Sequence, residues 1–286
     1  MTLLELVRAM SARLEGAGVA FGHGTTNAFD EAAWLVLWKL GLPLDSLDEQ
    51  AAVEVAVTDE AQVTALVDER IRTRKPTAYL TGEAWLQGVP FVVDERAIIP
   101  RSLIAEPLAD GTLDLWLGAH TQRVLDLCTG NGSLAVLAAL AWPEVTVDAC
   151  DLSADALDVA RLNVERHALA ARIRLRQGDG LQAADGRYDL ILCNPPYVNR
   201  NSMQQLPAEY RAEPPMALDG GDDGMSFIRG LLRDAGRHLT AHGVLVLEIG
   251  HERRHFDEAF PLLPTTWLST SAGDEQLLLL TREVLS

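Results

Sequence analysis

Short apolar runs alternate with segments of helical periodicity through the second half of the chain, and this alternation constrains the fold more than any other feature. The predicted strands lie at 123–127, 145–150, 172–176, 188–193 and 243–249. The predicted helices between them lie at 133–141, 154–167 and 226–239. Strands that alternate with helices form a parallel sheet covered on both faces. The sequence therefore predicts an α/β domain with a doubly wound, Rossmann-like sheet.

The last part of the chain predicts two strands of a different kind. Thr265–Leu268 and Gln276–Leu280 lie on either side of a short loop of small residues. Two strands joined by so short a loop pair in the antiparallel sense. We therefore expect a mostly parallel sheet that closes with an antiparallel pair.

Residues 1–82 predict a small helical domain instead. Either Thr26 or Asn27 is expected to cap one of its helices and Thr58 another, because short polar side chains accept hydrogen bonds from the free N–H groups of a first turn. Trp34 and Trp38 share one helical face and are expected to pack in the core of this domain.

A hairpin is predicted between these two parts. Ala84–Leu86 and Phe91–Val93 flank a turn at Gln87 and Gly88, and two short apolar segments around such a turn are typical of a hairpin. The expected organisation is a helical domain, a hairpin connector and an α/β domain, at 1–82, 83–100 and 101–286.

Charge and cysteine content exclude several classes of protein. The 286 residues carry 24 Lys and Arg against 41 Asp and Glu, a net charge of −17. Such a surface repels phosphates, which disfavours a DNA or RNA coat and suits a basic protein partner. The three cysteines form no CxxC pair, which argues against a cysteine zinc site and fits a cytoplasmic protein. Glu5 and Arg8 interrupt the apolar start, and no run is long enough to span a membrane.

A glycine turn follows the first strand of the α/β part. Gly130 and Gly132 allow the backbone to approach a ligand, and the helix that follows offers free N–H groups. Asp151 ends the next strand, where a carboxylate can bind ribose hydroxyls. A dinucleotide fits this pattern, but the third glycine of its motif is absent. The charge of Asp126 favours the ammonium group of S-adenosylmethionine over a pyrophosphate, and a tight turn without a ligand is the remaining alternative.

A second motif follows the strand at 188–193. It consists of Asn194, Pro195, Pro196 and Tyr197, and it lies beside the glycine turn because ligands bind at the carboxyl ends of parallel strands. The Asn194 side-chain oxygen and the Pro195 carbonyl form a pair of acceptors that suits a planar –NH₂ group, with Tyr197 as an aromatic wall. Such a clamp turns a weakly nucleophilic nitrogen toward a methyl donor and stabilises the charge that develops there. The alternative is a proline-rich loop that merely ends a strand.

The two motifs together resemble the S-adenosylmethionine-dependent N5-glutamine methyltransferases of the HemK/PrmB type. The segments Lys75–Gly82 and Ile99–Ser102 also match this family, and the resemblance extends over about residues 70–250. It implies a class I methyltransferase fold with a seven-stranded, mostly parallel sheet. It also implies that the helical domain at 1–82 recognises the substrate and that 101–286 is catalytic.

The resemblance implies a role for particular residues of this chain. The expected cofactor site for S-adenosylmethionine, and for its product S-adenosylhomocysteine, comprises Asp126, Cys128, Thr129, Gly130, Asn131, Gly132, Asp151, Asp179, Gly180 and Asn194. The expected catalytic residues are Asn194, Pro195, Pro196 and Tyr197, and the same four residues with Arg101 are expected to bind the target glutamine. No metal site is expected.

The segment Met203–Pro214 distinguishes two branches of this family. Its pattern MxxLPAEYRxEP is similar to the branch that methylates a glutamine of ribosomal protein L-three of the large subunit. The branch that acts on peptide-chain release factors remains the nearest alternative. N6-adenine methylation of DNA and a non-catalytic ribosome assembly factor are weaker ones, disfavoured by the net charge and by Asn194 respectively. Glu209 and its neighbours either contact the protein substrate or pin this loop.

Two further patterns have a rival interpretation. The segment His251–His255 matches HExxH, a zinc motif when it lies on a helix, but a solvated helix is the expected account. Arg70, Arg72, Arg74 and Lys75 could touch RNA, yet they lie at a predicted helix C-terminus, where cations are favoured in any case.

Overall fold

The computed structural model describes residues 1–118 and 121–286, which divide into two compact units. The helical unit consists of Met1–Ala84 together with Leu206–Ala212. The sheet unit consists of Trp85–Gln205 and Glu213–Ser286. A short piece from the second half of the chain therefore belongs to the helical unit, which the sequence did not indicate.

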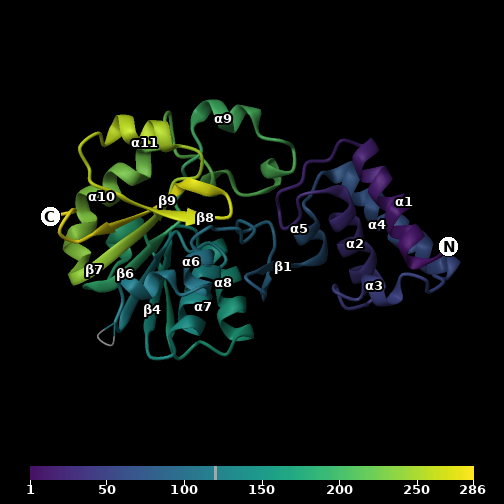
Figure 1. Ribbon diagram of the computed structural model, residues 1–286, viewed down its shortest axis with the longest axis horizontal. Helices are drawn as coiled ribbons and strands as arrows, with labels where there is room; N and C mark the ends of the chain where they lie inside the picture. The colour runs from purple at the N-terminus through teal and green to yellow at the C-terminus, as the bar shows by residue number, and fades with distance from the viewer. Residues whose placement is uncertain (119–120) are drawn as a thin grey trace. The chain divides into compact units, whose positions relative to one another are not determined.

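The sheet unit is built on one seven-stranded sheet with the order β5-β4-β3-β6-β7-β9-β8 (Figure 1). Its strands are β3 (Arg123–Leu127), β4 (Thr146–Asp151), β5 (Ile173–Gln177), β6 (Tyr188–Cys193), β7 (Leu239–Glu248), β8 (Thr266–Thr270) and β9 (Gly273–Thr281). Strands β3 to β7 pair in parallel, and β9 runs antiparallel to both β7 and β8. The predicted mostly parallel sheet with an antiparallel closing pair is confirmed.

Helices pack on both faces of this sheet, and shorter ones lie in the loops that connect its strands. They are α6 (Ala105–Ala109), α7 (Ser133–Ala141), α8 (Ala154–Arg166), α9 (Arg200–Gln205), α10 (Ser226–His238) and α11 (Arg253–Ala259), with short 3-10 turns at Thr112–Leu115, Gly180–Ala183 and Pro215–Ala217. Helix α7 is almost wholly apolar because it is buried on nearly every side. Nowhere in the described ranges is a helix both long and apolar enough to cross a membrane.

Alternation along the central strands assigns each residue to one face of the sheet. Leu125 and Leu127 of β3 pack in the same core cluster as Ile191 of β6 and Ile228 of α10. Asp126, between the two leucines, therefore faces the opposite side, where its carboxylate accepts a hydrogen bond from a backbone N–H of α7. The strand order reverses between β3 and β6, which is the position where open α/β sheets bind their ligands, beyond the carboxyl ends of the strands.

The predicted hairpin is confirmed as β1 (Glu83–Leu86) and β2 (Val89–Val92). Gln87 and Gly88 have φ values of 50° and 74°, and two positive φ angles are what a two-residue type I′ turn requires. Within the sheet unit, the Asn163 side chain of α8 accepts from the Val92 N–H at 2.7 Å and donates to its carbonyl at 2.9 Å. Strand β2 is thereby fixed onto α8.

The helical unit contains α1 (Leu3–Gly16), α2 (Ala28–Lys39), α3 (Leu47–Gln50), α4 (Val57–Thr73) and α5 (Thr77–Thr81), with a 3-10 turn at Tyr210–Ala212. Asn27 caps α2 as predicted, since its side chain accepts from the Asp30 N–H at 2.9 Å. The prediction for Thr58 is wrong, because α4 already begins at Val57 and its start has no side-chain cap. The prediction for Trp38 is also wrong: the residue is 38% exposed, and the core instead takes its α2 neighbours of the stretch 35–37.

Candidate active site

The carboxylate of Asp126, just before the turn between β3 and α7, is buried, and only one of its two oxygens accepts hydrogen bonds from the described residues. Asp126 Oδ2 accepts from Thr129 Oγ1 at 2.5 Å and from the Ala135 N–H at 3.0 Å. Asp126 Oδ1 is buried and has no hydrogen-bond partner among the described residues. Burial raises the pKa of Asp126 to about 7, against the lowering effect of these two hydrogen bonds. An unsatisfied buried oxygen is costly and points to a polar ligand.

The backbone of this turn is left-handed at three of its residues. Cys128, Gly130 and Gly132 have φ values of 58°, 56° and 80°, and a non-glycine residue in this region costs about 1–2 kcal/mol. A Cβ atom on Gly132 would lie 3.1 Å from the Cβ of Ala160 in α8. Gly132 is therefore required by the packing of the turn on α8 as well as by its own conformation.

Asp151, at the end of β4, ties that strand to the glycine turn. Its Oδ2 accepts from the Gly130 N–H at 2.8 Å, and its Oδ1 accepts from the Ser153 N–H at 2.9 Å. Burial raises the pKa of Asp151 from its ordinary value, while these backbone bonds oppose the shift. Each carboxylate oxygen can accept a second hydrogen bond, so the residue keeps capacity for ligand hydroxyls.

The other predicted cofactor residues lie around the same edge. Asn131 is buried and holds the turn, donating to the Ile98 carbonyl at 3.3 Å and accepting from the Ser133 N–H at 3.1 Å. Asp179 and Gly180 follow β5, with Asp179 exposed and Gly180 in the left-handed region at φ 52°. Their part in cofactor binding stays a prediction.

The Asn-Pro-Pro-Tyr motif begins where β6 ends. Cys193 pairs with Leu127 of β3 on one side and with Leu247 of β7 on the other, so Asn194 and the glycine turn leave the sheet at adjacent positions. Asn194 is half-buried, and its side-chain amide makes no hydrogen bond to any other residue within 1–118 or 121–286. Such a group is available to a substrate. Pro195 is buried beneath it.

Tyr197 is held by a residue that the sequence reasoning missed. Its hydroxyl donates to Oε1 of Glu248, the last residue of β7, at 3.1 Å. Burial, together with the nearby Glu248 charge, raises the pKa of Tyr197 well above its ordinary value, so the phenol stays neutral. A carboxylate directly after the apolar run 244–247 was the signal that could have identified Glu248.

Arg101 binds a carboxylate of its own chain. Its guanidinium makes two hydrogen bonds to Glu213, at 2.5 and 2.7 Å, and Glu213 also accepts from the Ile99 N–H at 3.0 Å. The Glu213 side chain is fully buried. Arg101 thus fixes the point at which the chain re-enters the sheet unit after residue 212, and substrate binding by Arg101 stays a prediction.

The contacts of Glu209 distinguish between the two roles that the sequence left open for it, substrate contact and attachment of its loop. Within the helical unit its Oε1 lies 3.3 Å from Arg70 and 3.4 Å from Arg74. Arg70 is 0% exposed and also binds Glu31 at 2.7 Å. Glu209 therefore pins the loop, and an RNA contact by Arg70 is excluded by its burial.

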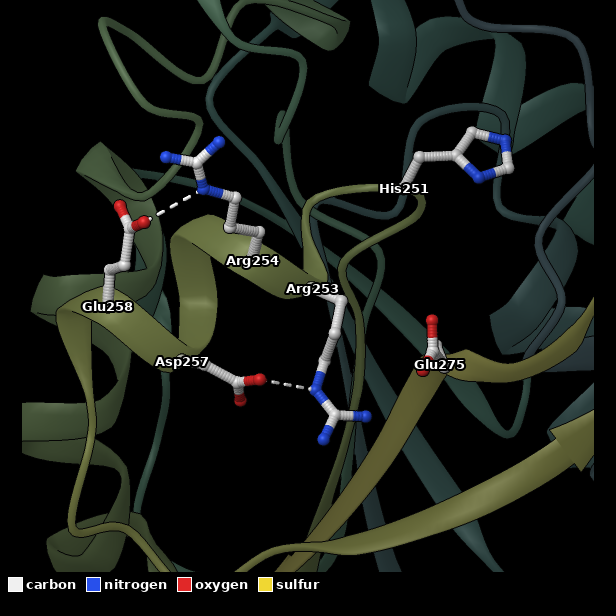
Figure 2. Close-up of a pocket in the computed structure, with 6 residues that line it drawn as sticks. All are labelled: His251, Arg253, Arg254, Asp257, Glu258 and Glu275. Atoms are coloured by element: carbon white, nitrogen blue, oxygen red, sulfur yellow. Dashed lines mark hydrogen bonds and ion pairs between the residues drawn. The ribbon is translucent and has the colours of Figure 1, made fainter.

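The HExxH segment does not lie on a helix as its motif requires. Helix α11 begins only at Arg253, so His251 precedes it, and Glu252 bonds Asn199 at 2.7 Å and His255 at 2.5 Å. Figure 2 shows the shallow pocket beside it, where the two arginines of α11 each pair with the acidic side chain four residues later. In the part of the chain that the structure describes, no three His, Cys, Asp or Glu side chains are grouped to hold a metal ion.

A seven-stranded sheet of this order, with a glycine turn and Asn-Pro-Pro-Tyr at its carboxyl edge, defines a Rossmann-like methyltransferase domain. The family model of the methyltransferase small domain matches residues 112–209. The solved hMettl16 catalytic domain, in complex with MAT2A 3′UTR hairpin 6, has the same fold. Its TM-score is 0.53 at 15% identity, over 79% of this chain and 81% of that one.

Curated relatives match along nearly the whole chain. The ribosomal protein uL3 glutamine methyltransferase of Bordetella pertussis is 52% identical over 100% of this chain and 96% of the relative. The proteins of the same name from Burkholderia pseudomallei and Neisseria meningitidis serogroup B are 49% and 46% identical, over 98% and 99% of this chain and 94% of each relative. The chain belongs to the family of ribosomal protein uL3 glutamine methyltransferases, which confirms the family resemblance of its motifs.

Proposed function

We propose that this enzyme transfers a methyl group from S-adenosylmethionine to the side-chain amide nitrogen of a glutamine in ribosomal protein uL3. The observation that carries the chemistry is the register of β3 against β6, in which Leu127 pairs with Cys193. This register starts the glycine turn and Asn194 side by side at one edge of the sheet. The choice of uL3 as substrate is supported by relatives that are named ribosomal protein uL3 glutamine methyltransferase and are 44–52% identical to this chain.

The cofactor residues fit S-adenosylmethionine in chemical type. The buried, unsatisfied Asp126 Oδ1 suits the ammonium group of an amino acid, and Asp151 has spare acceptor capacity for ribose hydroxyls. Asp179 would accept from the adenine amino group. Gly130 and Gly132 give the turn its left-handed backbone conformation, which side chains at these positions would strain. When bound, the cofactor supplies an electrophilic methyl group on a sulfonium centre.

The amide clamp performs the positioning. The Asn194 side-chain oxygen and the Pro195 carbonyl would accept the two N–H bonds of the glutamine amide, with Tyr197 and Pro196 beside it. Held in this way, the nitrogen turns its lone pair out of conjugation and toward the methyl donor. The two acceptors stabilise the positive charge that develops on the nitrogen. The methylated amide is acidic and would release one of its two N–H protons to water without a strong general base, with S-adenosylhomocysteine as the other product.

Charge supports a basic protein as substrate. The net charge of −17 attracts a basic ribosomal protein, and such steering weakens as salt is added. We therefore propose that uL3 is methylated in the cytoplasm, either free or on an assembling subunit. The proposed domain roles are substrate recognition for 1–82, a connector for 83–100 and catalysis for 101–286.

Transfer of labelled methyl from S-adenosylmethionine tests this proposal. The acceptors are purified uL3, a release factor and duplex DNA that contains adenine, assayed side by side with equal enzyme. We expect label on a glutamine of uL3 alone. Label confined to the release factor or to the DNA would overturn the substrate, and cofactor binding without label on uL3 would overturn the reaction.

Cofactor affinity should fall as the pH drops from 7 to 6. Burial raises the pKa of Asp126 to about 7, and a bound ammonium group favours the charged carboxylate. Binding below pH 7 therefore requires the loss of a proton, and linkage with a single such group makes the affinity roughly fivefold weaker at pH 6. Calorimetric titration with S-adenosylmethionine at both pH values measures this ratio.

The Asp126→Asn variant is the control for this pH dependence, because its amide does not titrate. It should bind the cofactor weakly and with equal affinity at pH 6 and pH 7. A fivefold difference that persists in this variant would assign the titration to another group.

A further inference from the structure

Glu248 is a buried carboxylate that directly follows the apolar run 244–247 of β7. It is the last residue of β7 and is 3% exposed. A buried charge is costly unless hydrogen bonds surround it. Three groups of the sheet unit donate hydrogen bonds to the Glu248 carboxylate. Two of them donate to one of its oxygens, and the third donates to the other.

One oxygen of Glu248 is occupied by the segment that follows Arg101. Ser102 Oγ donates to Glu248 Oε2 at 2.6 Å, and the Leu103 N–H donates to the same oxygen at 2.9 Å. These two bonds fix the orientation of the carboxylate. The other oxygen, Oε1, is thereby turned to Tyr197, whose hydroxyl it accepts at 3.1 Å.

Glycines bound Tyr197 on its other sides. A Cβ atom on Gly250, two residues after Glu248, would lie 2.4 Å from Cε2 of the Tyr197 ring. A Cβ atom on Gly224 would lie 2.2 Å from the Tyr197 carbonyl oxygen, and one on Gly220 would lie 2.8 Å from its carbonyl carbon. The ring of Tyr197 therefore packs against the main chain at Gly250, and its backbone packs against Gly220 and Gly224.

We propose that Glu248 is a positioning residue for methyl transfer: it holds the Tyr197 hydroxyl so that the ring stays fixed as the wall of the glutamine site. This inference rests on the proposed function and adds to it a residue outside the Asn-Pro-Pro-Tyr motif. Displacement of a positioning group by a fraction of an ångström lowers the rate of transfer more than the affinity for substrate. Glu248 therefore acts through Tyr197 and has no contact with the reacting atoms.

A double-mutant cycle tests this role. The enzymes are the unsubstituted protein, Tyr197→Phe, Glu248→Gln and the double variant, each assayed with uL3 for kcat and KM. We expect each single variant to lose about tenfold or more in kcat with KM changed less than threefold. The double variant should lose no more than the worse single variant, because both substitutions act on the same hydrogen bond. In Glu248→Gln the Leu103 N–H requires the amide oxygen, which leaves an –NH₂ group in place of the acceptor for Tyr197.

Tyr188→Phe is the matched control. Tyr188 is also a buried tyrosine that donates to a buried carboxylate, Asp148, at 2.7 Å. It begins β6, at the opposite end of the strand from Asn194. Its variant should lose stability, measured as a lower urea midpoint, while kcat stays within twofold of the unsubstituted enzyme.

Binding of a glutamine-containing uL3 peptide in the presence of S-adenosylhomocysteine adds a readout without turnover. We expect an unchanged Kd in Glu248→Gln. Unchanged kcat in Tyr197→Phe, or losses that multiply in the double variant, would overturn the positioning role while leaving the proposed function in place. Absence of label on uL3 with the unsubstituted enzyme would overturn the proposed function and this inference together.

Discussion

Substitution of Asn194→Ala should lower kcat for glutamine methylation by roughly a thousandfold, since removal of one preorganised group of an electrostatic clamp costs about 10²–10³ in rate. The side-chain oxygen is one of the two acceptors proposed to orient the substrate amide. Cofactor affinity should change less than threefold, because Asp126, Asp151 and Asp179, the charged residues of the proposed cofactor site, are untouched. Single-turnover transfer to uL3 and calorimetric binding of S-adenosylmethionine measure the two effects.

Two further substitutions sharpen this result. Asn194→Asp retains an acceptor oxygen and should keep more activity than Asn194→Ala. Asn201→Ala removes an exposed side chain of the same type from α9, and its activity should stay within twofold. Because the Asn194 amide has no hydrogen-bond partner in the described ranges, its removal leaves no buried group unsatisfied, and the variant should fold. Equal methylation by Asn194→Ala and the unsubstituted enzyme would rule out the clamp.

The sheet could be predicted from the sequence because its strands are mostly apolar and end at polar residues. Strands β3 and β6 were predicted residue for residue, at 123–127 and 188–193. Each is an apolar run that stops at a polar motif, and a parallel sheet gathers such stops at one edge. This rule alone predicted that the glycine turn and Asn194 lie next to each other.

The features that could not be predicted depend on contacts across long separations in the chain. Arg70 and Glu209 are 139 residues apart, and Tyr197 and Glu248 are 51 residues apart. Arg70 and Glu209 taken alone look like ordinary surface charges, and Tyr197 looks like a loop aromatic. Glu248 stands out as a carboxylate after an apolar run, but the sequence does not give its partner. Their partners are set by tertiary packing, which local periodicity does not encode. The exposure of Trp38 has the same origin, because a 12-residue helix such as α2 presents apolar side chains on more than one face.

The buried ion pairs of the helical unit separate two explanations for the loop at 206–212. If Glu209 served only as a contact for the substrate, loss of its partners would leave the stability of this unit unchanged. The side chains of Arg70, Glu31 and Glu209 are at most 3% exposed, however. Removal of one member of such a cluster leaves an uncompensated buried charge, which is strongly destabilising.

Arg70→Met should therefore lower the free energy of unfolding of the helical unit by about 3–5 kcal/mol. The guanidinium binds Glu31 at 2.7 Å, Glu209 at 3.3 Å and the Ala20 carbonyl at 3.0 Å, and methionine fills part of its volume without replacing these bonds. Urea unfolding followed by circular dichroism measures the loss, and limited proteolysis should detect release of 206–212. Arg72→Met, an exposed position on the same helix, is the matched control and should change the free energy by less than 0.5 kcal/mol, about the limit for an ordinary surface substitution.

The substitution Glu209→Gln tests whether the charge of Glu209 causes the loss of stability in Arg70→Met. Burial opposes the charge on Glu209, yet backbone N–H groups and Arg70 lower its pKa below the ordinary value. Its stabilising contribution is therefore present above the unfolded pKa and is lost as the pH falls through the lower folded pKa. In the Arg70→Met background, Glu209→Gln should recover part of the stability, because it removes one of the two buried carboxylates that lose Arg70. Glu209 then keeps the longer contact, to the partly exposed Arg74 at 3.4 Å. If Arg70→Met unfolds no more readily than Arg72→Met, the loop is held by packing, and the role of Glu209 returns to the substrate.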